Sequence, residues 1–453
     1  LQLKSNYTAD HTIDVRGAVV LPGFTDGHIH LTALGESLTS LSFDETSNLQ
    51  QIRDTMRKEA SNRPPDEWIT GGKWSLDALG EFPDRSMLDD VAPDNPVALH
   101  SKDLHSLWLN SRALAALDIT TDTADPKGGK IPRNTNGQPT GILQENAIRM
   151  YENRRPPRDV EALSRVHRAV SAHCYNHGIT AVHSIESLED WDLYRELHRQ
   201  GKLGLRIGGL LPLDNLDRII ERGTESGAGD DWLWTIGIKI FTDGALGSRT
   251  AWMKQPYENS GDRGMLLLSE DDLVSSVHRC HRHALSVGVH AIGDAAVAMT
   301  LRALQSSGAQ EHRDHLIDRI EHFQLIDPDD LEMIPAGLIA AMQPIHLPGD
   351  REPAGQFWGE RSRYAYAFQS LEKNGAVLAF GSDAPVEDVN PWISIQAAVA
   401  RRLSAAEEPW NPREKTSLGE AVAAYTVNNA RAAYREGTLG SLTVSAAGDA
   451  VVL

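Results

Sequence analysis

Two histidines separated by one residue, His28 and His30, form the sharpest chemical feature of the sequence. They end an apolar run punctuated by Pro and Gly (residues 18–27), a pattern typical of a buried strand. Side chains at i and i+2 of a strand point to the same face, so both imidazoles can reach one point. Such pairs suit zinc and other borderline divalent metals. Most His-x-His triplets are incidental, but the position at a strand end favours a metal site here.

Further candidate ligands stand at the ends of other short apolar runs. His290 ends the run VGVH, His322 ends RIEH, and Asp383 ends FGSD. Each one alone is better explained as a hydrogen-bonded core or loop residue. Their recurrence at successive strand ends is best explained by convergence at the mouth of a barrel, where active sites of α/β barrels are assembled.

Lys239 lies within the apolar segment IGIKIF (residues 236–241). A charged lysine among apolar neighbours is costly, so its pKa should fall. The neutral amine can add carbon dioxide to form a carbamate, which is a carboxylate ligand able to bridge two metals. The alternative is an ammonium group paired with an acid such as Asp243.

The elements that must position these residues alternate along the chain. Apolar runs predict strands at residues 18–30, 179–183, 236–244, 287–292, 319–323, 338–346 and 377–383, and helical spacing predicts helices at 159–176, 270–287 and 416–433. Alternation of strand and helix indicates a parallel sheet. No GxGxxG or P-loop motif follows the first strand, which disfavours nucleotide-binding folds. Because polar candidates lie at many strand ends, we predict an α/β barrel rather than an open doubly wound sheet.

Residues 31 to about 150 depart from this rhythm and contain Trp68, Trp74 and Trp108. We expect a large insertion after the first strand that lies over the barrel mouth and includes a second barrel strand near residues 97–99. The two ends of the chain are expected to form short β segments outside the barrel.

The composition limits the classes of function. The 453 residues are 40% hydrophobic and 24% charged, as in globular proteins. The 44 Lys and Arg against 63 Asp and Glu give a net charge of −19, which disfavours a nucleic-acid partner. Two cysteines leave no disulfide framework, and no apolar run approaches the length of about 20 residues that a membrane helix needs. We therefore expect a cytoplasmic protein without nucleic-acid or membrane partners.

Together these motifs resemble the amidohydrolase superfamily, specifically its amidohydrolase-3 or YtcJ-like branch, which includes N-substituted formamide deformylase-like enzymes. The matching segments are PGFTDGHIH (22–30), IKIFTDGALGSRT (238–250), HAIGD (290–294), IEH (320–322) and GSD (381–383). The resemblance extends from about residue 15 to residue 453. Departures occur near the expected pocket, at Leu104, Ser184 and Ala295, where the family usually has Gly, Asp and Arg.

The resemblance implies a distorted (β/α)8 barrel at residues 17–435, with a cap at about 31–150 and a partial β-sandwich subdomain from residues 1–16 and 436–453. It also implies one or two zinc ions. His28 and His30, with Asp383, would hold the more buried ion, and His290 and His322 would hold the second. Carbamylated Lys239 would bridge the two ions.

The implied reaction is hydrolysis of an amide-like or formamide-like C–N bond by a metal-activated hydroxide, with Asp383 as general base and then general acid. The second metal ion, or a pocket histidine such as His183 or His346 in the segment MQPIH, would polarise the carbonyl oxygen, and His346 is preferred for substrate contact. The other expected substrate contacts are Trp74 and His105 in the cap and Asp243 in the barrel. Trp74 is equally explained as a core residue.

Other functions remain open at the level of sequence. A lactonase or esterase could use the same metals, and a regulatory or binding protein could retain the barrel without catalysis. A deaminase is disfavoured, because no Glu lies shortly after His290. The expected partner is a small amide-like substrate, and the family suggests a homodimer.

Overall fold

The computed structural model describes residues 12–43, 47–74, 76–80, 83–101, 106–126, 129–154, 159–307 and 315–453. The chain divides into two compact units. Unit 1 comprises Leu1–Leu34 and Val160–Leu453, and unit 2 comprises Gly35–Asp159. Unit 2 therefore contains the segment that departs from the alternation of strand and helix. Among the described residues, no helix is long and apolar enough to cross a membrane.

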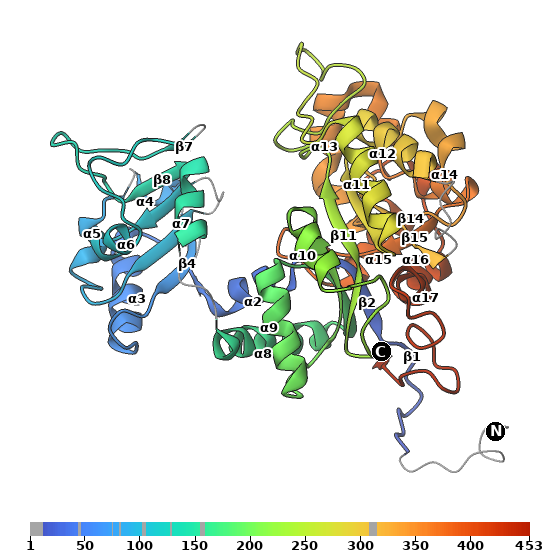
Figure 1. The fold of residues 1–453 in the computed structure, drawn as a ribbon, viewed down its shortest axis with the longest axis horizontal. Coiled ribbons are helices and arrows are strands. Elements are labelled where there is room, and N and C mark those ends of the chain that lie inside the picture. Colours follow the sequence, from blue (N-terminus) through green and yellow to red (C-terminus); the bar gives the residue numbers. More distant parts are fainter. Residues whose placement is uncertain are drawn as a thin grey trace. The chain divides into compact units, whose positions relative to one another are not determined.

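Unit 1 is built on an eight-stranded sheet in which all seven ladders are parallel (Figure 1). Its strands are β2 (Phe24–Ile29), β9 (Ile179–Ile185), β10 (Arg206–Pro212), β11 (Leu233–Phe241), β12 (Ser286–Ala291), β13 (Arg319–His322), β14 (Ile339–Met342) and β15 (Val377–Phe380). The sheet begins at β2 and ends at β15, and backbone bonds join these two edges. Asp383 N donates to His28 O at 2.7 Å, and His30 N donates to Ala384 O at 2.9 Å. The sheet is therefore a nearly closed, distorted (β/α)8 barrel, as predicted.

Helices follow the barrel strands in the chain and contribute apolar side chains to the hydrophobic clusters of unit 1. They are α2 (Leu31–Thr39), α8 (Val160–Asn176), α9 (Leu188–Arg199), α10 (Leu216–Glu221), α11 (Glu270–Arg282), α12 (Asp294–Ser306), α13 (Leu347–Trp358), α14 (Phe368–Lys373), α15 (Pro391–Ala400), α16 (Leu418–Ala424) and α17 (Val427–Ala432). Serine side chains cap the N-termini of several of these helices, for example Ser187 at α9 and Ser269 at α11.

In unit 1 one strand was missed and two expected helices were wrong. Strand β10 was not predicted, because its sequence RIGGLLP carries two glycines. A Cβ at Gly209 would lie 2.5 Å from the Trp191 ring, so the glycine is needed for close packing. The helix expected at 270–287 ends at Arg282, and Ala284 has a φ of 54° that no helix accommodates. The helix expected at 416–433 is two helices, α16 and α17.

Unit 2 has its own six-stranded sheet and two hydrophobic clusters. Its strands are β3 (Leu41–Ser42), β4 (Ile69–Trp74), β5 (Val97–Ser101), β6 (Ser106–Leu109), β7 (Gly129–Lys130) and β8 (Ile142–Glu145), and its helices are α3 (Leu49–Ser61), α4 (Leu76–Leu79), α5 (Ser86–Asp89), α6 (Ser111–Ala116) and α7 (Arg149–Arg154). The barrel strand expected near residues 97–99 is wrong, since β5 pairs with β4 and β6 in this separate sheet. The second strand of the barrel is β9.

The ends of the described chain meet in a two-stranded antiparallel sheet of β1 (Val20–Pro22) and β16 (Ala450–Val452). The partial sandwich subdomain expected from residues 1–16 and 436–453 lies in part outside the described residues, which begin at residue 12.

Candidate metal centre

The predicted ligands of unit 1 lie at the carboxyl ends of the barrel strands. His28 is on β2, Lys239 on β11 and His290 on β12, while His322 ends β13 and Asp383 follows β15. All five are buried. Because parallel strands end at the same rim of a barrel, residues from five separate strands converge on one region.

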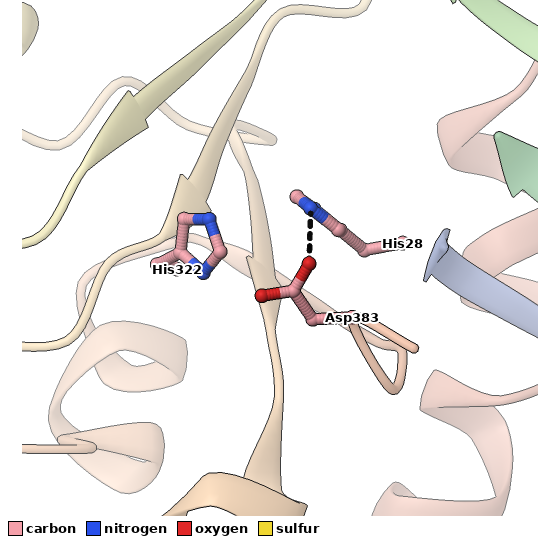
Figure 2. Close-up of side chains that lie close together, drawn as sticks. All are labelled: His28, His322 and Asp383. Carbon is pink, nitrogen blue, oxygen red and sulfur yellow. Dashed lines mark ion pairs between the residues drawn. The ribbon is translucent and has the colours of Figure 1, made fainter. Parts of the chain in front are cut away.

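Three of these residues form a cluster with the spacing of metal ligands. One ligand atom each from His28, His322 and Asp383 lies within 4.8 Å of the others, and Figure 2 shows the three side chains directed toward one another. Asp383 Oδ1 lies 3.4 Å from His28 Nε2 and 3.3 Å from Nε2 of His30, which is about one-third exposed. The sequence therefore predicted residues that the fold brings together, although they are separated by up to 355 positions.

Two backbone conformations bring His322 and Asp383 into this cluster. Their φ angles are 70° and 61°, in the left-handed region that residues other than glycine rarely adopt. On a regular strand the consecutive residues Glu321 and His322 would point to opposite faces. Here both reach His28, since Glu321 binds its Nδ1 and the His322 ring centroid lies 4.8 Å from the His28 ring.

Hydrogen bonds select the nitrogen that each histidine offers. His28 Nδ1 lies 2.5 Å from Glu321 Oε2, and His322 Nδ1 lies 2.9 Å from Gln343 Oε1. In both residues Nδ1 thus carries the proton and Nε2 remains basic. His290 is bonded the other way, through Nε2 to the carbonyl of Gly244 at 3.0 Å, which leaves Nδ1 basic. The His290 and His322 ring centroids are 4.5 Å apart.

Lys239 is 2% exposed, and its Nζ has no hydrogen-bond partner among the described residues. Burial lowers the pKa of Lys239 to about 8, which raises the fraction of neutral amine near neutral pH. The alternative partner Asp243 is engaged elsewhere, because it accepts hydrogen bonds from the backbone of Trp252, Ile292 and Gly293. Burial also raises the pKa of Asp243 to about 7.

The charges around His28 fit a bound cation. Burial and the nearby Lys239 oppose protonation of His28, yet the carboxylates of Glu321 and Asp383 raise its pKa above the usual value. The region therefore favours positive charge. Nε2 of His28, Nδ1 of His290 and Nζ of Lys239 are buried and without hydrogen bonds among the described residues, as expected for atoms that bind a metal. Imidazoles and a carboxylate form a donor set that suits a divalent ion.

The residues predicted to contact the substrate lie in different environments. His346 lies beside the cluster, with Nε2 3.7 Å from Asp383 Oδ2. His183 is buried deeper, where its Nδ1 lies 3.0 Å from a guanidinium nitrogen of Arg319. Trp74 is 1% exposed in the core of unit 2 and donates from Nε1 to Leu99 O. His105, like Leu104, lies outside the described residues. The roles assigned to these residues remain predictions.

Several residues that support the site were not singled out from the sequence. Glu321 joins His28 to Arg319, whose Nε donates to Glu321 Oε1 at 2.5 Å. Gln343 orients His322. Gly381 allows β2 and the end of β15 to approach, because a Cβ there would lie 2.3 Å from His28 N. One sequence feature could have identified Glu321. In the segment Arg-Ile-Glu-His of β13 an acid lies two residues after an arginine, and both are buried.

Ser184 stands at a position where the amidohydrolase-3 branch usually has Asp. Its side chain is part of the N-terminal cap of helix α2. Its Oγ accepts from Leu31 N at 3.1 Å and donates to Glu186 Oε1 at 2.6 Å, and the same Glu186 oxygen accepts from Thr32 N at 3.1 Å. The first turn of α2 directly follows His30. The serine therefore helps to hold the segment that carries this candidate ligand.

Comparisons with known proteins identify the family of this chain. The model of the amidohydrolase family (Amidohydro_3) matches residues 11–453. The chain is 31% identical over 476 residues to the putative amidohydrolase YtcJ of Bacillus subtilis (strain 168), covering 100% of this chain and 87% of that protein. It is 27% identical over 472 residues to the N-substituted formamide deformylase of Arthrobacter pascens, covering 97% and 84%.

A solved structure is similar over almost the whole chain. It is the crystal structure of an uncharacterized metal-dependent hydrolase from Pyrococcus furiosus, with a TM-score of 0.84 at 28% identity, covering 97% of this chain and 88% of that one. The family match spans the barrel from β2 to β15 and includes every residue of the candidate metal centre. The chain therefore belongs to the amidohydrolase family of hydrolases.

Proposed function

We propose that this hydrolase cleaves a C–N bond of a small amide-like or formamide-like molecule. The observation that carries the proposal is the buried cluster of His28, His322 and Asp383, whose ligand atoms lie within 4.8 Å of one another. The similarity to an N-substituted formamide deformylase supports the choice of bond.

The proposed metal is zinc, in one or two sites. His28, His30 and Asp383 would hold one ion, His290 and His322 a second, and carbamylated Lys239 would bridge them. A divalent ion in such a site lowers the pKa of water to about 7 and polarises a carbonyl group. The lowered pKa of Lys239 supports the carbamate, because only the neutral amine adds carbon dioxide.

Asp383 is the proposed proton carrier, because its two oxygens face different groups. Oδ1 faces His28 and His30, whereas Oδ2 faces His346 at 3.7 Å. Burial acts to raise the pKa of Asp383, but His28 and His30 hold it well below the usual value. The ionised carboxylate can take a proton from the attacking water on Oδ2 and pass it to the leaving nitrogen. His346 would contact the substrate carbonyl from the same side.

Elemental analysis tests the metal content of protein purified with bicarbonate present. One to two equivalents of zinc per chain would support the ligand set, and amides, formamides and lactones would then be screened for turnover. Protein that binds no metal on reconstitution would refute the proposal and favour a binding protein. Turnover of lactones, but not of amides or formamides, would show that the enzyme cleaves an ester bond instead of a C–N bond.

The variant Asp383→Asn tests the proton carrier. We expect kcat to fall about 10²- to 10⁴-fold, the usual contribution of a general acid–base group, while the far-ultraviolet circular dichroism spectrum is unchanged. Asp388→Asn, at an exposed position five residues later, is the matched control and should retain turnover. Full turnover by Asp383→Asn would remove Asp383 from the mechanism.

A further inference from the structure

Phe241 occupies an unusual position beside the candidate metal centre. It ends β11 two residues after Lys239, so both side chains face the barrel interior, whereas Ile238 and Ile240 face outward and are fully buried in the core of unit 1. The Phe241 ring centroid lies 4.9 Å from Lys239 Nζ and 5.3 Å from the His290 ring centroid. Phe241 is nevertheless 47% exposed. An apolar ring in contact with two candidate metal ligands therefore has a free face.

The loop after β11 carries further exposed apolar side chains, and its backbone returns to Thr242, the residue after Phe241. Met265, Leu266 and Leu267 are each at least 41% exposed. The backbone of this segment is tied to the start of the loop, since Leu267 N donates to Thr242 O at 2.9 Å and Met265 N donates to Thr250 O at 3.0 Å. Single exposed apolar residues are common on proteins, but three consecutive ones whose backbone bonds to the residue after Phe241 add apolar surface at this strand end.

We propose that Phe241 is a specificity-determining residue, whose free face packs against an apolar substituent of the substrate next to the scissile bond. This inference rests on the proposed amide hydrolysis. The reacting carbonyl must lie at the metal ligands, and the Phe241 ring contacts two of them. A substituent only two or three bonds from the carbonyl carbon can thus reach the ring at the carbon–carbon contact distance of about 3.5–4.0 Å. The preferred substrates are amides with a branched or cyclic hydrocarbon group, rather than small or charged amides.

The test compares two formamides whose leaving amines are similar, N-methylformamide and N-isobutylformamide. For the zinc-loaded wild-type protein we expect kcat/KM to be at least about tenfold higher for the isobutyl compound, since a few methylenes in an apolar site have this effect. Phe241→Ala should lower this ratio about tenfold, and Phe241→Leu should retain most of it. Tyr175→Ala removes an aromatic side chain that is 50% exposed on α8, away from the strand ends, and should leave the ratio unchanged.

A second readout does not require turnover. Calorimetry measures binding of N-methyl- and N-isobutylmethanesulfonamide, which resist hydrolysis, to the zinc-loaded proteins. We expect tighter binding of the isobutyl compound, and loss of the difference in Phe241→Ala. Zinc content and circular dichroism of each variant show that the metal centre and fold are retained.

The outcomes separate this inference from the proposed function. Hydrolysis of both formamides without a preference that depends on Phe241 would overturn the inference and leave the function standing. No hydrolysis of amides or formamides, but sulfonamide binding that depends on Phe241, would refute the function and support the apolar site. A change in oligomeric state of Phe241→Ala by light scattering, with substrate preference intact, would show that the face is covered by a second copy and would overturn the inference.

Discussion

Replacement of Glu321 by glutamine should weaken metal binding, because it moves the proton of His28 to the nitrogen that would bind the metal. Glu321 is fully buried, with Oε2 2.5 Å from His28 Nδ1 and Oε1 2.5 Å from Nε of Arg319. In Glu321→Gln we expect the amide oxygen at the Oε1 position, because a guanidinium group has only donors and Nε of Arg319 is its nearer contact, at 2.5 Å against 3.2 Å from Nη2 to Oε2. The amide nitrogen then faces His28 Nδ1, which must accept a hydrogen bond. The proton of a neutral His28 moves to Nε2, the atom directed at Asp383, and blocks metal binding there.

The expected loss follows from these contacts. Changes to the partner of a metal-binding histidine cost about 10- to 100-fold in metal affinity, or about 1.4–2.7 kcal/mol. Stability should fall as well, because Arg319 is fully buried and would lose its charged partner. Removing one member of a buried pair costs about 3–5 kcal/mol. Since glutamine keeps an oxygen on Arg319, we expect a loss near the lower end.

Competition with a chelator of known affinity measures zinc binding, and urea unfolding of the metal-free protein measures stability. Asp318→Asn is the matched control, because it weakens another buried histidine–carboxylate pair, His281 Nε2 to Asp318 Oδ1 at 3.1 Å, outside the cluster. It should lower stability without changing zinc affinity. If Glu321→Gln bound zinc within twofold of the wild-type protein, the reasoning about the His28 proton would be refuted.

Three further variants test other parts of the site. Lys239→Ala should lose metal and activity, and short carboxylic acids should partly restore both by replacing the carbamate; full metal content and turnover without additive would contradict a bridging role. Burial raises the pKa of Glu186 to about 7, so the folded state keeps a proton that the unfolded chain loses near pH 4.5. The free energy of unfolding should therefore decrease by about 3 kcal/mol between these pH values, and Glu186→Gln should remove this decrease. Urea unfolding of the wild-type protein and of Glu186→Gln at pH 5 and pH 8 checks this. An equal change in the free energy of unfolding of both proteins would disprove it. Gly381→Ala should cost about 1–3 kcal/mol and weaken zinc binding, since its Cβ would lie 2.3 Å from His28 N. Gly419→Ala, whose nearest neighbouring atom is 4.0 Å away, is its control in thermal unfolding, and equal Tm values would show that the approach at Gly381 is not tight.

Much of the barrel could be predicted because buried parallel strands have a recognisable sequence. Short apolar runs identified seven of the eight strands, including β11 and β12. Strand β10 was not predicted, because glycine has a low propensity for strands. Its two glycines make room for the rings of Trp191 and Trp234. The assignment of β5 to the barrel failed for a related reason. Periodicity identifies a strand but not the strands that pair with it. The pairing of β5 with β4 and β6 depends on residues outside β5 itself.

The sequence by itself determined the chemistry of the site, because imidazole, carboxylate and amine are properties of residue types and the period of a strand aligns His28 with His30. Only the tertiary structure decided how these groups are used. His28 presents Nε2 because Glu321, 293 positions away, occupies its Nδ1. His322 enters the cluster through a φ of 70° that no pattern predicts. Both depend on contacts between strands that are distant in the chain, and such contacts exist only once the barrel has closed.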